Sequence, residues 1–273
     1  MVSPDAVRPE GRFARLLRTQ GIARPIAWGF VALTIFMVGD GIEAGFLSPY
    51  LDERGFDAGQ IATLWATYGL VVALAAWLSG ALAEAWGPKR VMMLGFGIWV
   101  VFEVLFLVFG LMAGNFTIML VAFGIRGLGY PMFAYGFLVW ITMGTDENVM
   151  GRAVGWYWFF STLGLGVISS YFAGIVIPII GELATLWMAL AFVTVGGLMV
   201  AILLRNPVAK KITVANSVRG VVTSITIVGS NPKVGIGGVV RLINTLSFYA
   251  FVVFLSTYMV REVGFSISEW QII

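Results

Sequence analysis

The sequence predicts an all-α membrane protein, built as a bundle of hydrophobic helices. Hydrophobic residues make up 59% of its 273 residues and charged residues 11%, whereas an ordinary soluble domain has about a quarter charged residues. Apolar stretches recur along the chain, each near the roughly 20 residues that a helix needs to cross the hydrocarbon core. Cysteine and histidine are both absent. A proton carried near neutral pH would therefore need a carboxylate, or an unusual lysine or tyrosine.

Seven spans are expected, separated by segments rich in charges, glycine and proline. The first 25 residues are rich in arginine, contain no apolar run and indicate a cytosolic basic arm (1–25). Six spans follow in an N-terminal half (26–204), then a basic cytosolic connector without acidic residues (205–237), then a seventh span that opens a second half (238–273). The expected spans are 26–51, 59–83, 90–112, 117–140, 153–178, 183–204 and 238–260.

The positions of lysine and arginine indicate a cytoplasmic N-terminus, because short cytoplasmic loops carry an excess of these residues. With the N-terminus inside, only Arg54 and Arg261 fall outside, and Arg126 lies within a span. The inside segments hold all the others: Arg8, Arg12, Arg15, Arg18, Arg24, Lys89, Arg90, Arg152, Arg205, Lys210, Lys211, Arg219, Lys233 and Arg241. We expect a multi-pass protein of the bacterial inner membrane, whose basic connector meets anionic lipid headgroups and not nucleic acid.

A short internal repeat connects the first span with the seventh. Three pairs of segments recur in the same order: 46–51 (FLSPYL) with 254–259 (FLSTYM), Gly55-Phe56 with Gly264-Phe265, and Gln60-Ile61 with Gln271-Ile272. Repeats of six plus six helices are one way in which transporters are built. If the repeat is real, the chain stops as its eighth span begins, and the rest of the second half is missing.

Four ionisable residues lie inside the predicted spans: Asp40, Glu43, Glu103 and Arg126. A charge at the bilayer centre costs at least about 2.5–3.5 kcal/mol, so such residues face a cavity or a partner. Asp40, Glu103 and Arg126 each lie about ten residues from the outer end of their span, which places them at one depth of about 15 Å. Either Arg126 neutralises Glu103 or Asp40 as a structural pair, or the cluster binds a solute and a coupling proton. Three acids against one base favour the second interpretation.

A second charged group follows the second span, in the stretch 80–90 (GALAEAWGPKR). Gly80 would allow helices to approach, and Glu84 at a helix end lies near Lys89 and Arg90 across the turn at Gly87. Such a cluster could latch an inner gate, whereas the alternative is a simple stop-transfer turn with anchoring cations.

Three further polar residues are candidates for a solute cavity. Tyr130 lies four residues after Arg126 on the same helix face, and Asn244 and Tyr249 lie on the seventh span. For the last two, hydrogen bonding between helices is an equally good interpretation.

The stretch 80–90 resembles the signature loop of the major facilitator superfamily, and Arg126-Gly127-Leu128-Gly129 resembles its arginine-and-glycine motif on the fourth helix. The signature usually has aspartate where Glu84 stands and a basic residue where Ala85 stands, so we expect a weakened charge network. The stretches 39–50 and 76–80 are similar to those of the bacterial polyol permeases. The resemblance implies a major facilitator-type bundle, with the six-helix N-terminal half and the first helix of the C-terminal half.

The same resemblance implies a secondary active transporter that takes up a polyol, such as ribitol or arabinitol, together with protons by alternating access. Its partners would be a small polar solute, protons and the lipid bilayer. One alternative is a carrier of small organic anions or other metabolites, with Arg126 as the carboxylate partner; another is an inactive truncated fragment. Neither a phosphate-binding glycine-rich loop nor a nucleophile–base pair is visible, so we expect no enzymatic activity, cofactor or metal.

Overall fold

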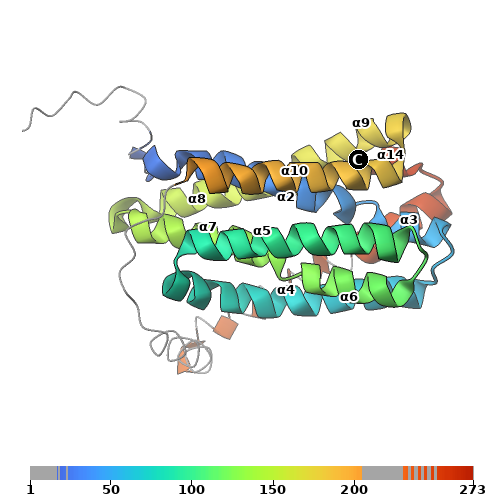
Figure 1. The fold of residues 1–273 in the computed structure, drawn as a ribbon, viewed down its shortest axis with the longest axis horizontal. Helices are drawn as coiled ribbons and strands as arrows, with labels where there is room; N and C mark the ends of the chain where they lie inside the picture. The colour runs from blue at the N-terminus through green and yellow to red at the C-terminus, as the bar shows by residue number, and fades with distance from the viewer. Residues whose placement is uncertain are drawn as a thin grey trace, which may run out of the picture.

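The computed structural model is a bundle of long helices that run along one axis (Figure 1). Within the described residues, six helices are long and apolar enough to cross a membrane, and all regular structure is helical. The predicted fold class is therefore confirmed. The structure describes residues 17, 19–22, 24–204, 230–232 and 251–272, with the pairs 235–236, 239–240, 243–244 and 247–248.

The first span consists of a 3₁₀ turn, η1 (Arg24–Ile26), and two helices, α2 (Ala27–Ala44) and α3 (Leu47–Glu53). Most of α2 is buried, and it packs most extensively on α10 (Glu182–Leu203). A Cβ atom on Gly39 would lie 2.5 Å from the carbonyl oxygen of Ala189 in α10. Only glycine allows this approach, which places the neighbouring Asp40 deep in the bundle.

Tight turns bound the second span, α4 (Ala58–Trp86). It begins at a capping box, in which the Gln60 N–H donates to the Asp57 side chain (2.9 Å) and the Asp57 N–H donates to the Gln60 side chain (3.0 Å). It ends at Gly87, whose φ of +91° favours glycine. We call the end of the bundle with this turn the Gly87 end, and the opposite end, with the turn at Gly55, the Gly55 end.

The third span is α5 (Pro88–Leu105), which continues as a π-helical turn, η2 (Phe106–Leu111). Proline at the first helical position is pre-organised for a helix and leaves no N–H unsatisfied there. α5 packs along α7 and also contacts α6 and α10. It therefore touches both the fourth and the sixth spans.

The fourth span is broken. Asn115 caps α6 (Phe116–Arg126), and α7 (Gly129–Gly144) begins after two intervening residues. The sequence predicts one uninterrupted span at 117–140, so the break is a difference between expectation and structure. It makes Arg126 the last residue of α6, where the negative end of the helix dipole favours a cation.

The fifth span comprises α8 (Glu147–Thr162), a π-helical turn η3 (Leu163–Ile168) and α9 (Ser169–Ile180), and the sixth is α10. Large apolar side chains cover the outer surface of the bundle; Ile179, for example, is 74% exposed and Ile202 is 75% exposed. A surface of this kind fits the acyl chains of a bilayer.

The seventh predicted span, 238–260, is described only in part. Its described residues are helical and include η4 (Phe251–Leu255) and α13 (Ser256–Tyr258). They are followed by η5 (Met259–Val263) and by α14 (Ile267–Ile272), which packs on α9. Figure 1 shows α14 at the same end of the bundle as α3. Most of the predicted connector, 205–237, lies outside the described residues.

Two turns at the Gly55 end are similar, which supports the predicted repeat, although the hydrogen bond that closes the turn spans five residues in one and six in the other. Gly55 has φ +87° and Gly264 has φ +88°. The N–H of the next residue donates back to the preceding helix in both turns: from Phe56 to the carbonyl of Leu51, and from Phe265 to that of Met259, each at 3.1 Å.

The helices after these turns also begin alike. Ser266 and Glu269 exchange hydrogen bonds at the start of α14, with the Ser266 N–H donating to Glu269 (2.9 Å) and the Glu269 N–H donating to the Ser266 hydroxyl (3.2 Å). Glu269 is therefore the counterpart of Gln60, and the predicted correspondence of Gln60 with Gln271 is wrong. Gln271 instead lies buried against the first span: its Oε1 atom would be 2.3 Å from a Cβ atom on Gly45.

Candidate functional site

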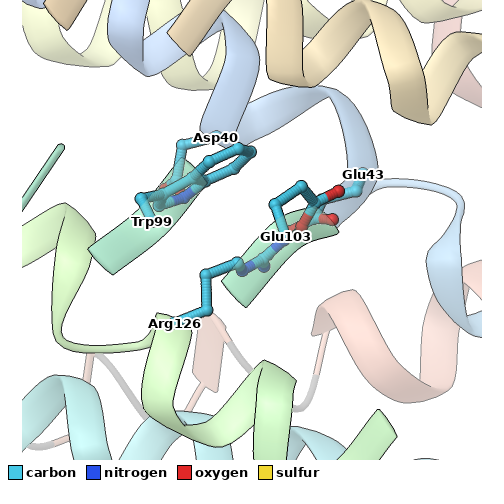
Figure 2. Close-up of polar contacts among 5 residues, drawn as sticks. All are labelled: Asp40, Glu43, Trp99, Glu103 and Arg126. Atoms are coloured by element: carbon cyan, nitrogen blue, oxygen red, sulfur yellow. Dashed lines mark hydrogen bonds and ion pairs between the residues drawn. The ribbon is translucent and has the colours of Figure 1, made fainter. Parts of the chain in front are cut away.

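The charged residues predicted to share one depth meet inside the bundle. Asp40 is 7% exposed, and Glu43, Glu103 and Arg126 are each at most 1% exposed. The guanidinium of Arg126 donates from Nη1 to Glu103 Oε2 and from Nη2 to Glu43 Oε1, as Figure 2 shows. Residues from α2, α5 and α6 therefore form one buried ion cluster, which we call the Arg126 cluster (Glu43, Glu103 and Arg126).

Aromatic rings surround the guanidinium of Arg126. Its carbon lies 4.4 Å from the ring centre of Phe123, 4.9 Å from that of Trp99 and 5.5 Å from that of Tyr68. Cation–π attraction offsets part of the cost of removing a cation from water. The rings also exclude water from the ion pairs, which strengthens the electrostatic interactions within the cluster.

Asp40 belongs to the site without joining the ion cluster. Among the ion pairs of the described residues, Arg126 meets only Glu43 and Glu103. The Asp40 carboxylate instead accepts a hydrogen bond from Trp99 Nε1 at 2.7 Å. Trp99 was not predicted from the sequence as a residue of the site. Trp99 lies four residues before Glu103, however, which places the two on one face of α5.

Several polar atoms of the cluster have no hydrogen-bond partner within the described chain: Glu43 Oε2, Glu103 Oε1 and Arg126 Nε. Buried polar groups are normally satisfied, and leaving one without a partner costs about 1–3 kcal/mol. Two acceptors and one N–H donor beside each other can bind a group that both donates and accepts hydrogen bonds, as a hydroxyl does.

The remaining predicted cavity residues have different positions. Tyr130 is half-buried at the start of α7, with its ring centre 6.2 Å from that of Tyr135. Asn244 is exposed. Tyr249 lies outside the described residues. The cavity roles expected for these three residues stay predictions. Groups of His, Cys, Asp and Glu that could hold a metal ion do not occur in the described part of the chain.

A family model of the Major Facilitator Superfamily matches residues 29–273. The chain belongs to this superfamily. It is 40% identical over 258 residues to an alpha-ketoglutarate permease of Bacillus subtilis (strain 168), with 93% of this chain and 59% of that protein covered. Over 254 residues it is 40% identical to a D-arabinitol transporter and 39% identical to a ribitol transporter of Klebsiella pneumoniae, with 92% of this chain and 60% of each relative covered.

The expected resemblance to the polyol permeases of the major facilitator superfamily is confirmed by these matches. The chain spans about 60% of the length of the curated relatives it matches. The relatives are named as permeases and transporters.

The loop that resembles the superfamily signature differs from the expected charge network. Lys89 Nζ donates to the carbonyls of Ala201 (2.8 Å) and Leu204, at the C-terminal end of α10. Glu84 and Arg90 are exposed, and within the described chain Glu84 pairs with neither Lys89 nor Arg90. The strong interaction at the Gly87 end is thus a lysine that satisfies helix-terminal carbonyls, which the dipole of α10 favours.

The two glycines of this superfamily loop have different roles. Gly87 is required by its positive φ. Gly80 was expected to allow a close helix approach, but a Cβ atom there would meet no described atom within 4 Å. The close approach expected at Gly80 therefore involves no described residue and stays a prediction.

Proposed function

We propose that this protein is a secondary active transporter that takes up a small neutral polyol together with protons by alternating access. The imbalance of charge in the buried site carries the proposal: Asp40, Glu43 and Glu103 face one cation, Arg126. Burying an unpaired carboxylate is costly, so a site with an excess of carboxylates favours proton uptake. The chain contains no histidine, so a carboxylate is the natural proton carrier.

The hydrogen-bonding groups of the Arg126 cluster support a polyol as the solute. A hydroxyl donates one hydrogen bond and accepts others. Hydroxyls can therefore donate to Glu43 Oε2 and Glu103 Oε1 and accept from Arg126 Nε, which are the buried atoms without partners in the described chain. The similarity to transporters named for D-arabinitol and ribitol supports the same class of solute.

A small organic anion is the second candidate, because an equally similar relative is named as an alpha-ketoglutarate permease. The charges of the site favour it less. Both terminal nitrogens of Arg126 are already bound to carboxylates, and an anion would approach Asp40, Glu43 and Glu103. Two like charges 4 Å apart repel by about 4 kcal/mol at an effective dielectric constant near 20.

We further propose how the chain lies in the membrane. The excess of lysine and arginine in alternate segments supports a cytoplasmic N-terminal arm (1–25) and connector (205–237), and hence a cytoplasmic Gly87 end. Residues 26–204 would then form the six-helix half, with 238–273 opening the second half. The solute would bind between halves at mid-depth and be exposed alternately to each side. Contacts of Lys89 at the Gly87 end are part of the inner gate, with Glu84 and Arg90 at the same turn.

Uptake into proteoliposomes tests the proposal. Labelled ribitol, D-arabinitol and alpha-ketoglutarate are supplied in turn, with and without an imposed proton gradient. We expect saturable polyol uptake that the gradient drives and a protonophore abolishes. Asp40→Asn should remove the dependence on the gradient, and Asp146→Asn, an exposed carboxylate outside the site, should not.

Each part of the proposal has its own contrary result. If none of the three labelled solutes shows saturable uptake, the proposal that the protein transports such solutes is overturned. If only alpha-ketoglutarate is taken up, the transported solute is an organic anion and not a polyol. Gradient-driven uptake that survives in Asp40→Asn would remove Asp40 as the proton carrier.

A further inference from the structure

One side chain, Trp99, joins the two parts of the site. Its Nε1–H edge donates to Asp40 Oδ1 at 2.7 Å, and its ring centre lies 4.9 Å from the guanidinium carbon of Arg126. Figure 2 shows the indole beside Asp40, with Arg126 reaching toward Glu43 and Glu103. Trp99 thus contacts both the isolated carboxylate and the cation of the Arg126 cluster.

The bundle leaves the indole little freedom to move. Trp99 is 0% exposed. A Cβ atom on Gly129, at the start of α7, would lie 2.6 Å from the Trp99 Cβ, so the backbones of α5 and α7 are in close contact there. The ring of Phe36 meets the indole edge-on, with ring centres 6.3 Å apart. A group held this tightly transmits a displacement to its neighbours instead of absorbing it.

We propose that Trp99 is a positioning residue that couples Asp40 to the Arg126 cluster, so that proton binding and solute binding influence each other through one indole ring. The inference rests on the proposed function and adds to it the residue that connects the proton site with the solute site. Energetic coupling between two sites is reciprocal: a solute that shifts Arg126 changes the environment of Asp40, and a change at Asp40 alters solute affinity.

The two contacts of the indole give this coupling a physical cause. The hydrogen bond to Asp40 is charge-assisted while the carboxylate is ionised, and it weakens when a proton from the aqueous phase neutralises that carboxylate. The indole edge is then held less firmly, and the tight packing around the ring passes even a small displacement on to Arg126. A solute hydroxyl that binds Glu43, Glu103 or Arg126 acts on the same ring from the other side.

Other titratable groups also face this region, and the test must separate their effects from that of Asp40. They include Glu43 on α2, Tyr68 on α4, Glu103 on α5 and Arg126 on α6, and Tyr130 lies at the start of α7. In the described chain, the hydrogen bond between Trp99 and Asp40 involves none of these groups. A substitution that removes only the indole N–H therefore acts on Asp40 first.

Trp99→Phe comes nearest to this substitution, because it removes the N–H and retains an aromatic face against Arg126. It also removes part of the ring, a loss of buried volume that the Trp140→Phe control below reproduces. The protein is reconstituted in vesicles, and two rates are compared with the labelled solute that the uptake panel identifies among the three probes. Proton-gradient-driven uptake needs the coupling, whereas solute counterflow exchanges solute without net proton movement. We expect driven uptake to fall about tenfold relative to counterflow, in the range typical of coupling between sites.

Trp140→Phe is the matched control. Trp140 is also buried, at 4% exposed, and among the described residues it has no hydrogen bond or cation–π contact with a charged group. It should change driven uptake and counterflow by the same factor. The double variant Asp40→Asn/Trp99→Phe should have the same ratio of the two rates as Asp40→Asn alone, because Trp99 acts through Asp40.

The outcomes separate this inference from the proposed function. Wild-type vesicles without gradient-driven uptake would overturn the proposed function itself. If the wild type couples and Trp99→Phe lowers both rates equally, as a loss of packing does, the coupling role of Trp99 is overturned while proton-coupled transport stands. If Trp99→Phe leaves both driven uptake and counterflow at their wild-type rates, the coupling role of Trp99 is overturned as well.

Discussion

Replacing Arg126 with methionine leaves two buried carboxylates without their cation. Methionine retains about the length of the aliphatic part of arginine and carries no charge. Glu43 and Glu103 are at most 1% exposed and each accepts a hydrogen bond from the guanidinium, so neither carboxylate can turn to water. Breaking a buried ion pair by removing one partner costs about 3–5 kcal/mol. We expect Arg126→Met to destabilise the folded protein by about that amount, or roughly 10 °C in melting temperature at about 2–4 °C per kcal/mol.

The triple variant Glu43→Gln/Glu103→Gln/Arg126→Met shows where the loss originates. It removes all three charges and so leaves no unpaired charge inside the bundle, and an uncompensated buried charge is the main cost of breaking a buried ion pair. We therefore expect the triple variant to recover most of the melting temperature that Arg126→Met loses. Arg261→Met is the matched control, because Arg261 also pairs with a carboxylate, Asp52 at 3.4 Å, but its side chain is 67% exposed; an exposed pair contributes about 0–1 kcal/mol.

Thermal unfolding in detergent, followed by intrinsic tryptophan fluorescence, measures all four proteins under one condition. If Arg126→Met melts within about 2 °C of the wild type, the two unpaired carboxylates do not destabilise the fold as expected, since a change of that size is about 1 kcal/mol or less. The explanation by unpaired carboxylates also fails if the triple variant melts no higher than Arg126→Met. The destabilisation would then come from lost packing around the guanidinium and not from unpaired carboxylates.

Three further substitutions test other parts of the structure. Gly45→Val should displace the Gln271 amide, which occupies the space a Cβ atom needs, and lower the melting temperature of the protein. Lys89→Gln should lower the melting temperature through weaker bonds to the carbonyls of α10, by about 1–2 kcal/mol, and the exposed Arg90→Gln should not. Gly264→Ala should cost about 1–2 kcal/mol because of its φ of +88°, measured as faster hydrogen exchange in the turn after η5.

Much of the fold could be predicted because each span is long and apolar. The six spans between 26 and 204 correspond to six helices, since a bilayer requires about 20 apolar residues per crossing. The break at Gly127-Leu128 was not predicted, because hydropathy records only the apolar character of residues and not whether a helix continues.

The site could be predicted in part from charge alone. Asp40, Glu43, Glu103 and Arg126 stand out because apolar spans tolerate charges only in protected positions. The sequence did not say which acids pair with Arg126, because pairing depends on how α2 and α5 are rotated about their axes. It gave no prominence to Trp99 either, since tryptophan in an apolar span resembles any other large hydrophobic residue, and only its spacing from Glu103 indicates that both face the site.

The helix α5 connects the site with the Gly87 end. Lys89 near its start binds the last carbonyls of α10, Trp99 contacts Asp40 and Arg126, and Glu103 binds Arg126. Lys89 and Trp99 are ten positions apart in the continuous helix Pro88–Leu105, which corresponds to about 15 Å. Helices do not compress along their axes, so a shift of α5 that accompanies a rearrangement around Arg126 also moves Lys89 against α10. A change of charge at the buried site therefore has a direct mechanical path to the contact between Lys89 and the end of α10.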